Sequence, residues 1–173
     1  MKKILFLFLF LFLFINIERS NAENKIAYIN VNHILNNSIV GQSISKHIQN
    51  IKETKINDFN KLEKTLSEKE TNLVNKRNII DEDEFNNEIE ILRKEIVEYK
   101  NEKNKFNKEI DQKKIKYTKI VLNTLNPIIS KYVEDNSIEI VLSKKNIIIA
   151  KKELDITKPV MDLLNNQLVK IDF

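Results

Sequence analysis

The architecture of this chain is set by residues 80–99, which read IDEDEFNNEIEILRKEIVEY. From Phe85 onward, apolar and aromatic residues recur at alternating steps of four and three, the 3.5-residue repeat of a left-handed coiled coil. The step from Ile80 to Phe85 is five, so the repeat changes phase across the acidic residues 81–84. This break predicts that one helix ends and another begins at the acidic segment.

The same repeat extends to both sides of the break, over residues 43–121, without a glycine or a proline. Before the break, its seam positions are Ile48, Lys52, Lys55, Phe59, Leu62, Leu66, Lys69, Leu73, Lys76 and Ile80. After the break, they are Phe85, Ile89, Leu92, Ile96, Tyr99, Lys103, Phe106, Ile110, Lys113, Tyr117 and Ile120. One continuous helix would be a rod of about 118 Å, whereas a fold-back at residues 81–84 would give two arms of about 55 Å.

Two features favour the fold-back, an antiparallel helical hairpin. Asp81 can cap a new helix by accepting the backbone N–H of Glu84, and acidic residues suit the positive end of a helix. Each seam position of the first arm also meets a seam position of the second arm when their numbers add up to 165, as for Phe59 and Phe106. Because lysines dilute the seam, we expect the distal part of the hairpin to be flexible.

Apolar segments at the two ends of the chain predict a small body that completes an α+β fold. Residues 25–31 predict a buried strand, and residues 138–142 and 147–150 predict a strand hairpin around a polar turn. Open sheet edges in so small a body favour self-association. The residues expected in the oligomerisation core are Ile26, Tyr28, Ile138, Ile140, Leu142, Ile147 and Ile149.

Three single residues predict local structure around the body. Gly41, the only glycine, indicates a bend or a close contact that excludes a side chain. Pro127 predicts a kink, or a new helix start after Asn126, in the helical segment 120–133. Thr157 predicts the N-cap of a last helix.

The first 22 residues predict a secretory signal peptide. A positive start precedes the apolar residues 4–15, and Ser20 and Ala22 place small residues where cleavage after Ala22 requires them. The alternative is an uncleaved membrane anchor, although these apolar residues fall short of the about 20 that a spanning helix needs. The predicted division of the chain is 1–22, signal peptide; 23–42, first part of the body; 43–121, hairpin arm with its turn near 81–84; and 122–173, second part of the body.

Composition excludes several classes of function. There is no cysteine, so a disulfide, a thiol nucleophile and a lipid-modified cysteine are absent. His33 and His47 have no metal-ligand spacing and are expected at surface or cap positions. Without a phosphate-binding loop, a Ser/His/Asp pattern or zinc spacing, we expect no enzyme activity, cofactor or metal. Removal of residues 1–22 leaves 26 basic and 24 acidic residues, a charge too small for nucleic-acid binding.

Some apolar residues of the arm lie beside the seam: Ile56, Val74, Ile79, Ile91, Val97 and Ile115. One interpretation is that they widen the seam, since Val74 and Ile91 also satisfy the pairing rule. The other is that they make a weakly adhesive face on an otherwise charged arm. The pattern alone leaves both interpretations open.

In chain order, the residues resemble the Skp/OmpH family of periplasmic chaperones. Residues 25–31 are similar to the first strand of the family, and residues 34–41 to its short helix and turn. Residues 132–142 resemble its helix-to-strand segment, and residues 154–157 the segment before its terminal helix. With the arms between these segments, the resemblance covers essentially the whole mature chain.

The resemblance implies a homotrimer whose β-rich body carries three helical arms around a cavity. It also implies an ATP-independent holdase that keeps unfolded outer-membrane β-barrel proteins from aggregating in the periplasm. Two features depart from the family. The tip at residues 81–84 is acidic, whereas arm tips in the family are often basic. No lipopolysaccharide-binding cluster can be matched residue by residue, so a membrane surface or lipopolysaccharide stays open as a partner.

If the protein is such a chaperone, the arm carries its client-binding residues. Those expected are Ile56, Val74, Ile79, Ile91, Val97, Lys103, Lys105 and Lys108. The simpler interpretation of the lysines is a solvated helix face. The alternative function is an exported or membrane-anchored structural coiled coil, which predicts a rod with a sealed seam.

Overall fold

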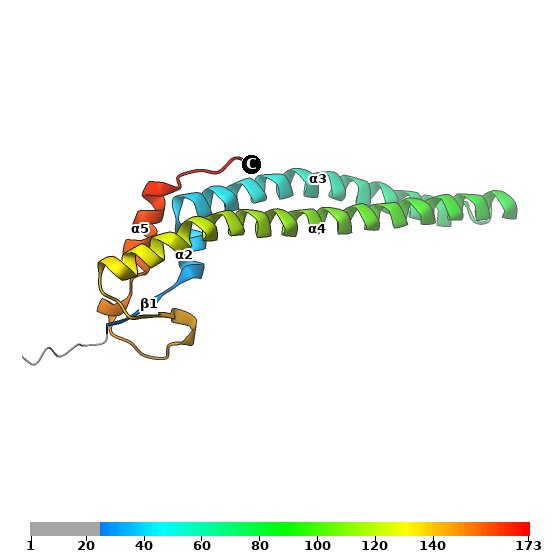
Figure 1. The fold of residues 1–173 in the computed structure, drawn as a ribbon. Helices are drawn as coiled ribbons and strands as arrows, with labels where there is room; N and C mark the ends of the chain where they lie inside the picture. Colours follow the sequence, from blue (N-terminus) through cyan, green and yellow to red (C-terminus); the bar gives the residue numbers. More distant parts are fainter. Residues whose placement is uncertain (1–24) are drawn as a thin grey trace, which may run out of the picture.

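The structure, a computed structural model, describes residues 25–173. The predicted signal peptide and its cleavage site lie outside these residues. The elements follow in the order β1 (Ile26–Ile29), α2 (Val31–Asn37), α3 (Ile39–Lys76), α4 (Glu82–Asp135), β2 (Ile140–Ser143), the short 3-10 helices η1 (Lys144–Asn146) and η2 (Lys152–Leu154), and α5 (Thr157–Gln167). Figure 1 shows the small elements gathered at one end of a long hairpin made by α3 and α4. The fold is α+β, as predicted, and mostly helical.

The two long helices lie side by side and antiparallel (Figure 1). The chain reverses at residues 77–81, just before the turn predicted near residues 81–84, and Asp81 is the N-cap of α4. Its Oδ1 accepts the backbone N–H of Glu84 at 2.9 Å, which confirms the predicted cap. The predicted pairing of Phe59 with Phe106 is confirmed as well, because their rings meet edge to face with centroids 5.7 Å apart.

Both helices extend further toward the body than the heptad pattern indicated. Helix α3 begins at Ile39 and is capped by Ser38, whose hydroxyl accepts a backbone N–H at 3.2 Å. Helix α4 runs to Asp135 without interruption at Pro127, so the predicted new start after Asn126 is wrong. Pro127 is exposed, and water can therefore satisfy the carbonyl that a proline leaves without an N–H partner.

The seam buries its apolar residues in two separate clusters. The root cluster, next to the body, consists of Ile48, Ile110 and Tyr117. The distal cluster consists of Phe59, Leu66, Leu73, Leu92 and Tyr99. Lysines occupy the seam between them, and the Nζ of Lys55 lies 5.1 Å from the ring centroid of Phe59. The partly buried Phe106 packs against both clusters, so an aromatic ring among lysines links the two levels of the arm.

The strand predicted at residues 138–142 is confirmed as β2, whereas the strand predicted at residues 147–150 and the hairpin between the two are wrong. Residues 147–150 form no strand, and β2 pairs in parallel with β1, in the register Ile26↔Ile140 to Ile29↔Ser143. A parallel pair needs a long crossover, which the whole hairpin supplies. The other edge of β1 is occupied where the Tyr28 carbonyl accepts the N–H of Ile156 at 3.0 Å. Residues 147–150 consequently find no strand partner within the described chain.

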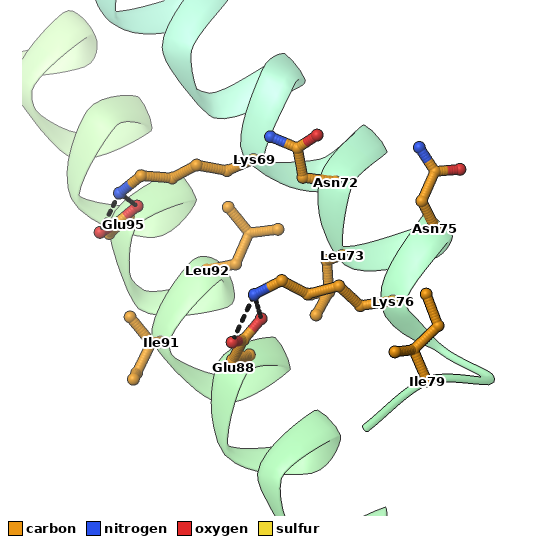
Figure 2. Close-up of a pocket in the computed structure, with 10 residues that line it drawn as sticks. All are labelled: Lys69, Asn72, Leu73, Asn75, Lys76, Ile79, Glu88, Ile91, Leu92 and Glu95. Atoms are coloured by element: carbon orange, nitrogen blue, oxygen red, sulfur yellow. Dashed lines mark hydrogen bonds and ion pairs between the residues drawn. The ribbon is translucent and has the colours of Figure 1, made fainter. Parts of the chain in front are cut away.

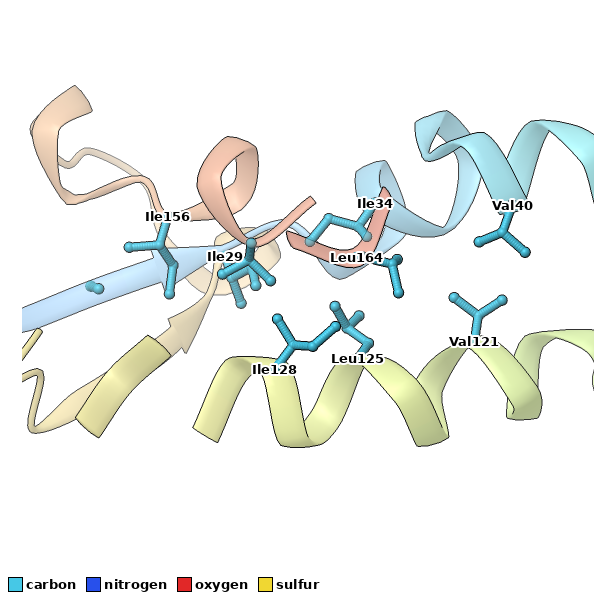
Figure 3. Packing of buried hydrophobic residues seen from close by; sticks show 10 residues of the cluster. Ile29, Ile34, Val40, Val121, Leu125, Ile128, Ile156 and Leu164 are labelled. Carbon is cyan, nitrogen blue, oxygen red and sulfur yellow. The ribbon is translucent and has the colours of Figure 1, made fainter. Parts of the chain in front are cut away.

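One face of the strand pair covers the core of the body. Ala27 and Ile29 point into it, and Val141 packs against it from β2. The helices contribute Ile34, Val40, Val121, Leu125, Ile128, Val160 and Leu164, and Ile156 joins them from just before α5. Figure 3 shows this packing. Since α4 supplies both this core and the arm, one unbroken helix leads from the body into the hairpin.

Single residues explain how the chain turns around this core. A side chain on Gly41 would place its Cβ 2.0 Å from the carbonyl oxygen of Leu35, which confirms the predicted close contact. Of the histidines, His33 is exposed, as expected. The expectation is wrong for His47, which is half-buried and stacks on Phe173.

The predicted N-cap at Thr157 is wrong by one residue. Ile156 holds the cap position of α5 and makes no side-chain hydrogen bond there. Instead, Oδ1 of Asp155 accepts the backbone N–H of Thr157 at 3.0 Å. The Thr157 hydroxyl accepts the backbone N–H of Asn30 at 2.8 Å, so it ties α5 to the end of β1.

Candidate binding surface on the helical arm

The apolar residues beside the seam are exposed. Their exposed fractions are 47% for Ile56, 65% for Val74, 79% for Ile79, 50% for Ile91, 55% for Val97 and 69% for Ile115. Val74 and Ile91 line different cavities rather than packing on each other. Both helices are right-handed and run in opposite directions, so one step from the seam turns the two residues to opposite sides of the hairpin. The interpretation that this pair widens the seam is therefore wrong.

Near the end of the arm, the two helices leave a cavity of about 510 Å³, which we call the tip groove. It is lined by Lys69, Asn72, Leu73, Asn75, Lys76, Ile79, Glu88, Ile91, Leu92 and Glu95 (Figure 2). Leu73 and Leu92 form its floor and are only 8% exposed, whereas Ile79 and Ile91 stand at its sides. The groove thus combines an apolar floor with exposed apolar walls.

Two ion pairs bridge the helices along the tip groove. The Nζ of Lys76 lies 2.9 Å from Oε1 of Glu88, and the Nζ of Lys69 lies 2.6 Å from Oε1 of Glu95. Figure 2 shows both bridges on the same side of the hairpin, with Leu92 between them. Each lysine and each glutamate in the lining has an opposite charge as its partner, so the groove carries no net charge.

A second, smaller cavity lies on the opposite side of the same level. It measures about 230 Å³ and is lined by Glu70, Leu73, Val74, Phe85, Ile89, Leu92, Arg93 and Ile96. Leu73 and Leu92 line both cavities. The seam here is one layer of side chains thick and is reachable from either side.

The three lysines expected to hold clients have different surroundings. Lys103 donates to the Tyr99 hydroxyl at 3.0 Å, and that hydroxyl donates to Glu63 at 2.7 Å. The hydrogen bond with Tyr99, and then the nearby charge of Glu63, raise the pKa of Lys103. Lys105 and Lys108 are exposed and form no ion pair within residues 25–173. Only these two are free to meet a ligand, while Lys103 helps to join the arms.

The residues expected in the oligomerisation core fall into two groups. Ile26, Ile140 and Leu142 lie on the open face of the strand pair and are between 43% and 49% exposed, and Ile149 is also exposed. Tyr28 is buried, while Ile138 and Ile147 are half-buried, and Ile138 packs against the core of its own chain. Ile148, which sequence reasoning left out of this set, is the most exposed of these apolar residues.

Sequence reasoning also missed most of the tip groove. The pairing rule could have found Glu88 and Glu95. The residue number of each adds up to 164 with that of the lysine it contacts. A glutamate one step from the expected partner of a seam lysine can reach that lysine across the hairpin. Asn72 and Asn75 carry no such signal, since an exposed amide is common on helix surfaces.

Neither a metal site nor a membrane-spanning helix is found in the part of the chain that is described. Among residues 25–173, no three histidine, aspartate or glutamate side chains come together as a metal site. No helix within this range combines the length and the apolar character that a membrane span requires.

The chain has a small α+β body and one long helical hairpin, with exposed apolar side chains along the hairpin and a groove near its end. These features define a class of arm-bearing binding proteins. The sequence profile of the family described as outer membrane protein (OmpH-like) matches residues 25–164, and the chain belongs to that family. No curated protein sequence matches it.

A solved structure has the same fold. The crystal structure of a candidate outer membrane chaperone (OmpH-like) from Caulobacter crescentus CB15 superposes with a TM-score of 0.75. The alignment covers 88% of this chain and 90% of that chain, at 17% identity. At this identity, the similarity establishes the shared fold.

Proposed function

We propose that this protein is an ATP-independent holdase chaperone of the periplasm, which binds unfolded outer-membrane β-barrel proteins and slows their aggregation. The observation that carries the proposal is the exposure of single apolar side chains along a charged arm, from Ile56 to Val97. Membership of the OmpH-like family and the fold shared with a candidate outer membrane chaperone support it.

The spacing of these side chains suits a holdase. When a client covers an exposed isoleucine or valine, the complex is stabilised by about 25 cal/mol per Å² of apolar surface buried. One such contact is weak and reversible, whereas several contacts along one arm act jointly and bind the same unfolded chain more tightly. Binding of this kind requires no particular client sequence and no nucleotide.

Self-association as a homotrimer is part of the proposal. The open face of the strand pair presents Ile26, Ile140 and Leu142, and the neighbouring Ile148 and Ile149 are at least 90% exposed. A patch of this kind on an exported protein favours burial against other copies. Three arms on a common body would then surround one client.

Export is the remaining part of the proposal. The apolar residues 4–15 and the small residues before position 23 support cleavage after Ala22. A structural coiled coil is the weaker candidate, because two cavities open onto Leu73 and Leu92 where that function needs a sealed seam.

The test is dilution of a urea-unfolded outer-membrane β-barrel protein into buffer with and without this protein, followed by light scattering. We expect slower growth of scattering without added ATP and a mass of three chains in light scattering coupled to size exclusion. Unchanged aggregation would overturn the holdase function, and a dimeric rod would overturn the trimer.

A further inference from the structure

We infer that the tip groove binds an extended client segment whose alternate residues are apolar. The inference rests on the proposed function and assigns one site and one kind of occupant to it. The occupant lays its apolar side chains on Leu73 and Leu92 and its backbone along the two lysine–glutamate bridges.

The charges of the lining select for apolar side chains. Lys69 and Lys76 are already paired with Glu95 and Glu88, so an incoming charged side chain would lose water without meeting an unpaired opposite charge. An apolar side chain would instead cover the floor and the exposed half of Ile91. The cavity of about 510 Å³ is large enough to admit side chains rather than water alone.

The polar rim suits a peptide backbone. An ammonium group has three donors, and the paired carboxylate does not use all of them, so Lys69 and Lys76 keep donors for carbonyl groups of a client. The exposed amides of Asn72 and Asn75 offer both donors and acceptors on the same rim. Hydrogen bonds to the backbone hold a segment without selecting its sequence.

The spacing favours a strand-like segment over a helix. Lys69 and Lys76 are seven residues apart, which is about 10.5 Å along a helix. A strand advances about 3.3 Å per residue, so about three client residues span the two bridges. A helical segment would bring no free backbone groups to the rim, because its own turns satisfy them. Strands of outer-membrane barrels alternate apolar and polar residues, which matches an apolar floor below and water above.

Ile115 provides a matched comparison. It lies on the same helix as Ile91 and is even more exposed, at 69% against 50%. It lines neither cavity near the tip. If exposure alone caused binding, Ile115 would capture at least as much client as Ile91.

The experiment places the photo-crosslinking residue benzoylphenylalanine at position 91 or at position 115 of the whole protein. Each variant is illuminated with a urea-unfolded outer-membrane β-barrel protein, and the products are mapped by mass spectrometry. We expect about tenfold more client product from position 91, because burial of one apolar side chain strengthens binding by about this factor. We also expect the products to map to alternating apolar positions of the client.

The outcomes separate this inference from the proposed function. Equal yields from positions 91 and 115, or products that join two copies of this chain only, would overturn the groove while the unmodified protein still slows aggregation. Products confined to helical client segments would overturn the choice of occupant. Failure of the unmodified protein to slow aggregation would overturn the proposed function, whichever position reacts.

Discussion

The ring of Phe173 stacks on the imidazole of His47, with centroids 3.9 Å apart and ring planes inclined by 8°. The same ring meets Tyr117 edge to face at 5.4 Å. His47 belongs to α3 and Tyr117 to α4, so the segment after α5 contacts both helices of the arm at its root. Ile171 of this segment packs against both the body core and the root cluster. The tail therefore joins the two helices where the arm leaves the body.

Substitution of Phe173 by alanine should loosen the root of the arm. Phe173 is 52% exposed, so we expect a loss of about 1–2 kcal/mol, from half of an aromatic side chain and its ring contacts. Amide hydrogen exchange should accelerate in residues 44–51 and 113–121, and the ring protons of His47 should shift in NMR spectra. Val169→Ala, at a similarly exposed tail position, is the control. Unchanged exchange and an unshifted His47 signal in Phe173→Ala would show that the tail does not hold the root.

Asp155→Asn should weaken the body at neutral pH. Burial raises the pKa of Asp155, but its hydrogen bonds with Thr157 and its ion pair with Lys144 outweigh that effect and place the pKa below the ordinary value. The carboxylate therefore stabilises the fold above a pH of about 4, and this contribution disappears as the pH falls through the lowered pKa. We expect the variant to lose about 1 kcal/mol at pH 7, as for a lost helix cap.

Urea unfolding at pH 7 and pH 3 measures this effect. The difference between Asp155→Asn and the natural protein should shrink at the lower pH. Glu153→Gln is the control, because Glu153 is a nearby exposed acid that forms no ion pair within residues 25–173. A difference that is the same at both pH values would mean that the charge of Asp155 is not responsible.

Leu73→Ala should open the distal arm and leave the body intact. Leu73 is 8% exposed and lies in the distal cluster, which shares no buried residue with the root cluster or the body core. Removal of its side chain should cost about 2 kcal/mol, at the low end for a buried leucine because the seam is thin. Hydrogen exchange should rise in residues 62–103 only.

Leu62→Ala is the matched comparison for Leu73→Ala. Leu62 is also a seam position, but it is 39% exposed, so its replacement should change exchange much less. Equal effects of the two substitutions, or faster exchange around Leu125 in the body, would contradict the separation of the clusters.

Replacement of Val74, Ile91 and Val97 by serine should weaken the proposed client holding and leave the proposed homotrimer intact. All three side chains are at least half exposed, so their removal takes adhesive surface from the arm without emptying a buried cluster. Light scattering of an unfolded β-barrel client measures holding, and circular dichroism and size exclusion check the fold and the mass. Holding equal to that of the natural protein would show that these residues are not the binding surface.

Ile140→Asp and Val141→Asp should have different effects although they are neighbours in β2. Ile140 lies on the open face of the strand pair and is 49% exposed, so an aspartate there should dissociate the proposed homotrimer and preserve the helical content. Val141 packs against the core, so an aspartate there should cost more than about 3 kcal/mol and unfold the body. Mass from light scattering and helicity from circular dichroism distinguish the two. An unchanged mass of the Ile140→Asp variant would show that this face is not part of an interface between copies.

The hairpin could be predicted because its determinants are close together in the sequence. Heptad steps, the phase break and the Asp81 cap each involve residues within one or two helical turns, and the distance from the turn then sets which seam residues meet. The strand partner of β1 could not be found this way. Residues 138–142 and 147–150 look like a hairpin, but β1 offers its edge to β2 from more than a hundred residues away.

The candidate binding surface on the arm was predicted only in part. Exposure of Ile56, Val74 and Ile91 follows from their positions beside the seam. That Val74 and Ile91 face opposite sides, and that Lys103 is tied to Tyr99, depends on how the two helices turn relative to each other.

The sequence by itself therefore determined the hairpin, the Asp81 cap that begins its second helix and the membership of the OmpH-like family. Only the tertiary structure decided the parallel pairing of β1 with β2 and the contact of Phe173 with His47. It also decided the opening of the tip groove over Leu73 and Leu92. The physical reason is range, because a helix forms from contacts within a few residues, whereas strand partners and grooves arise from segments that meet only after the chain has folded.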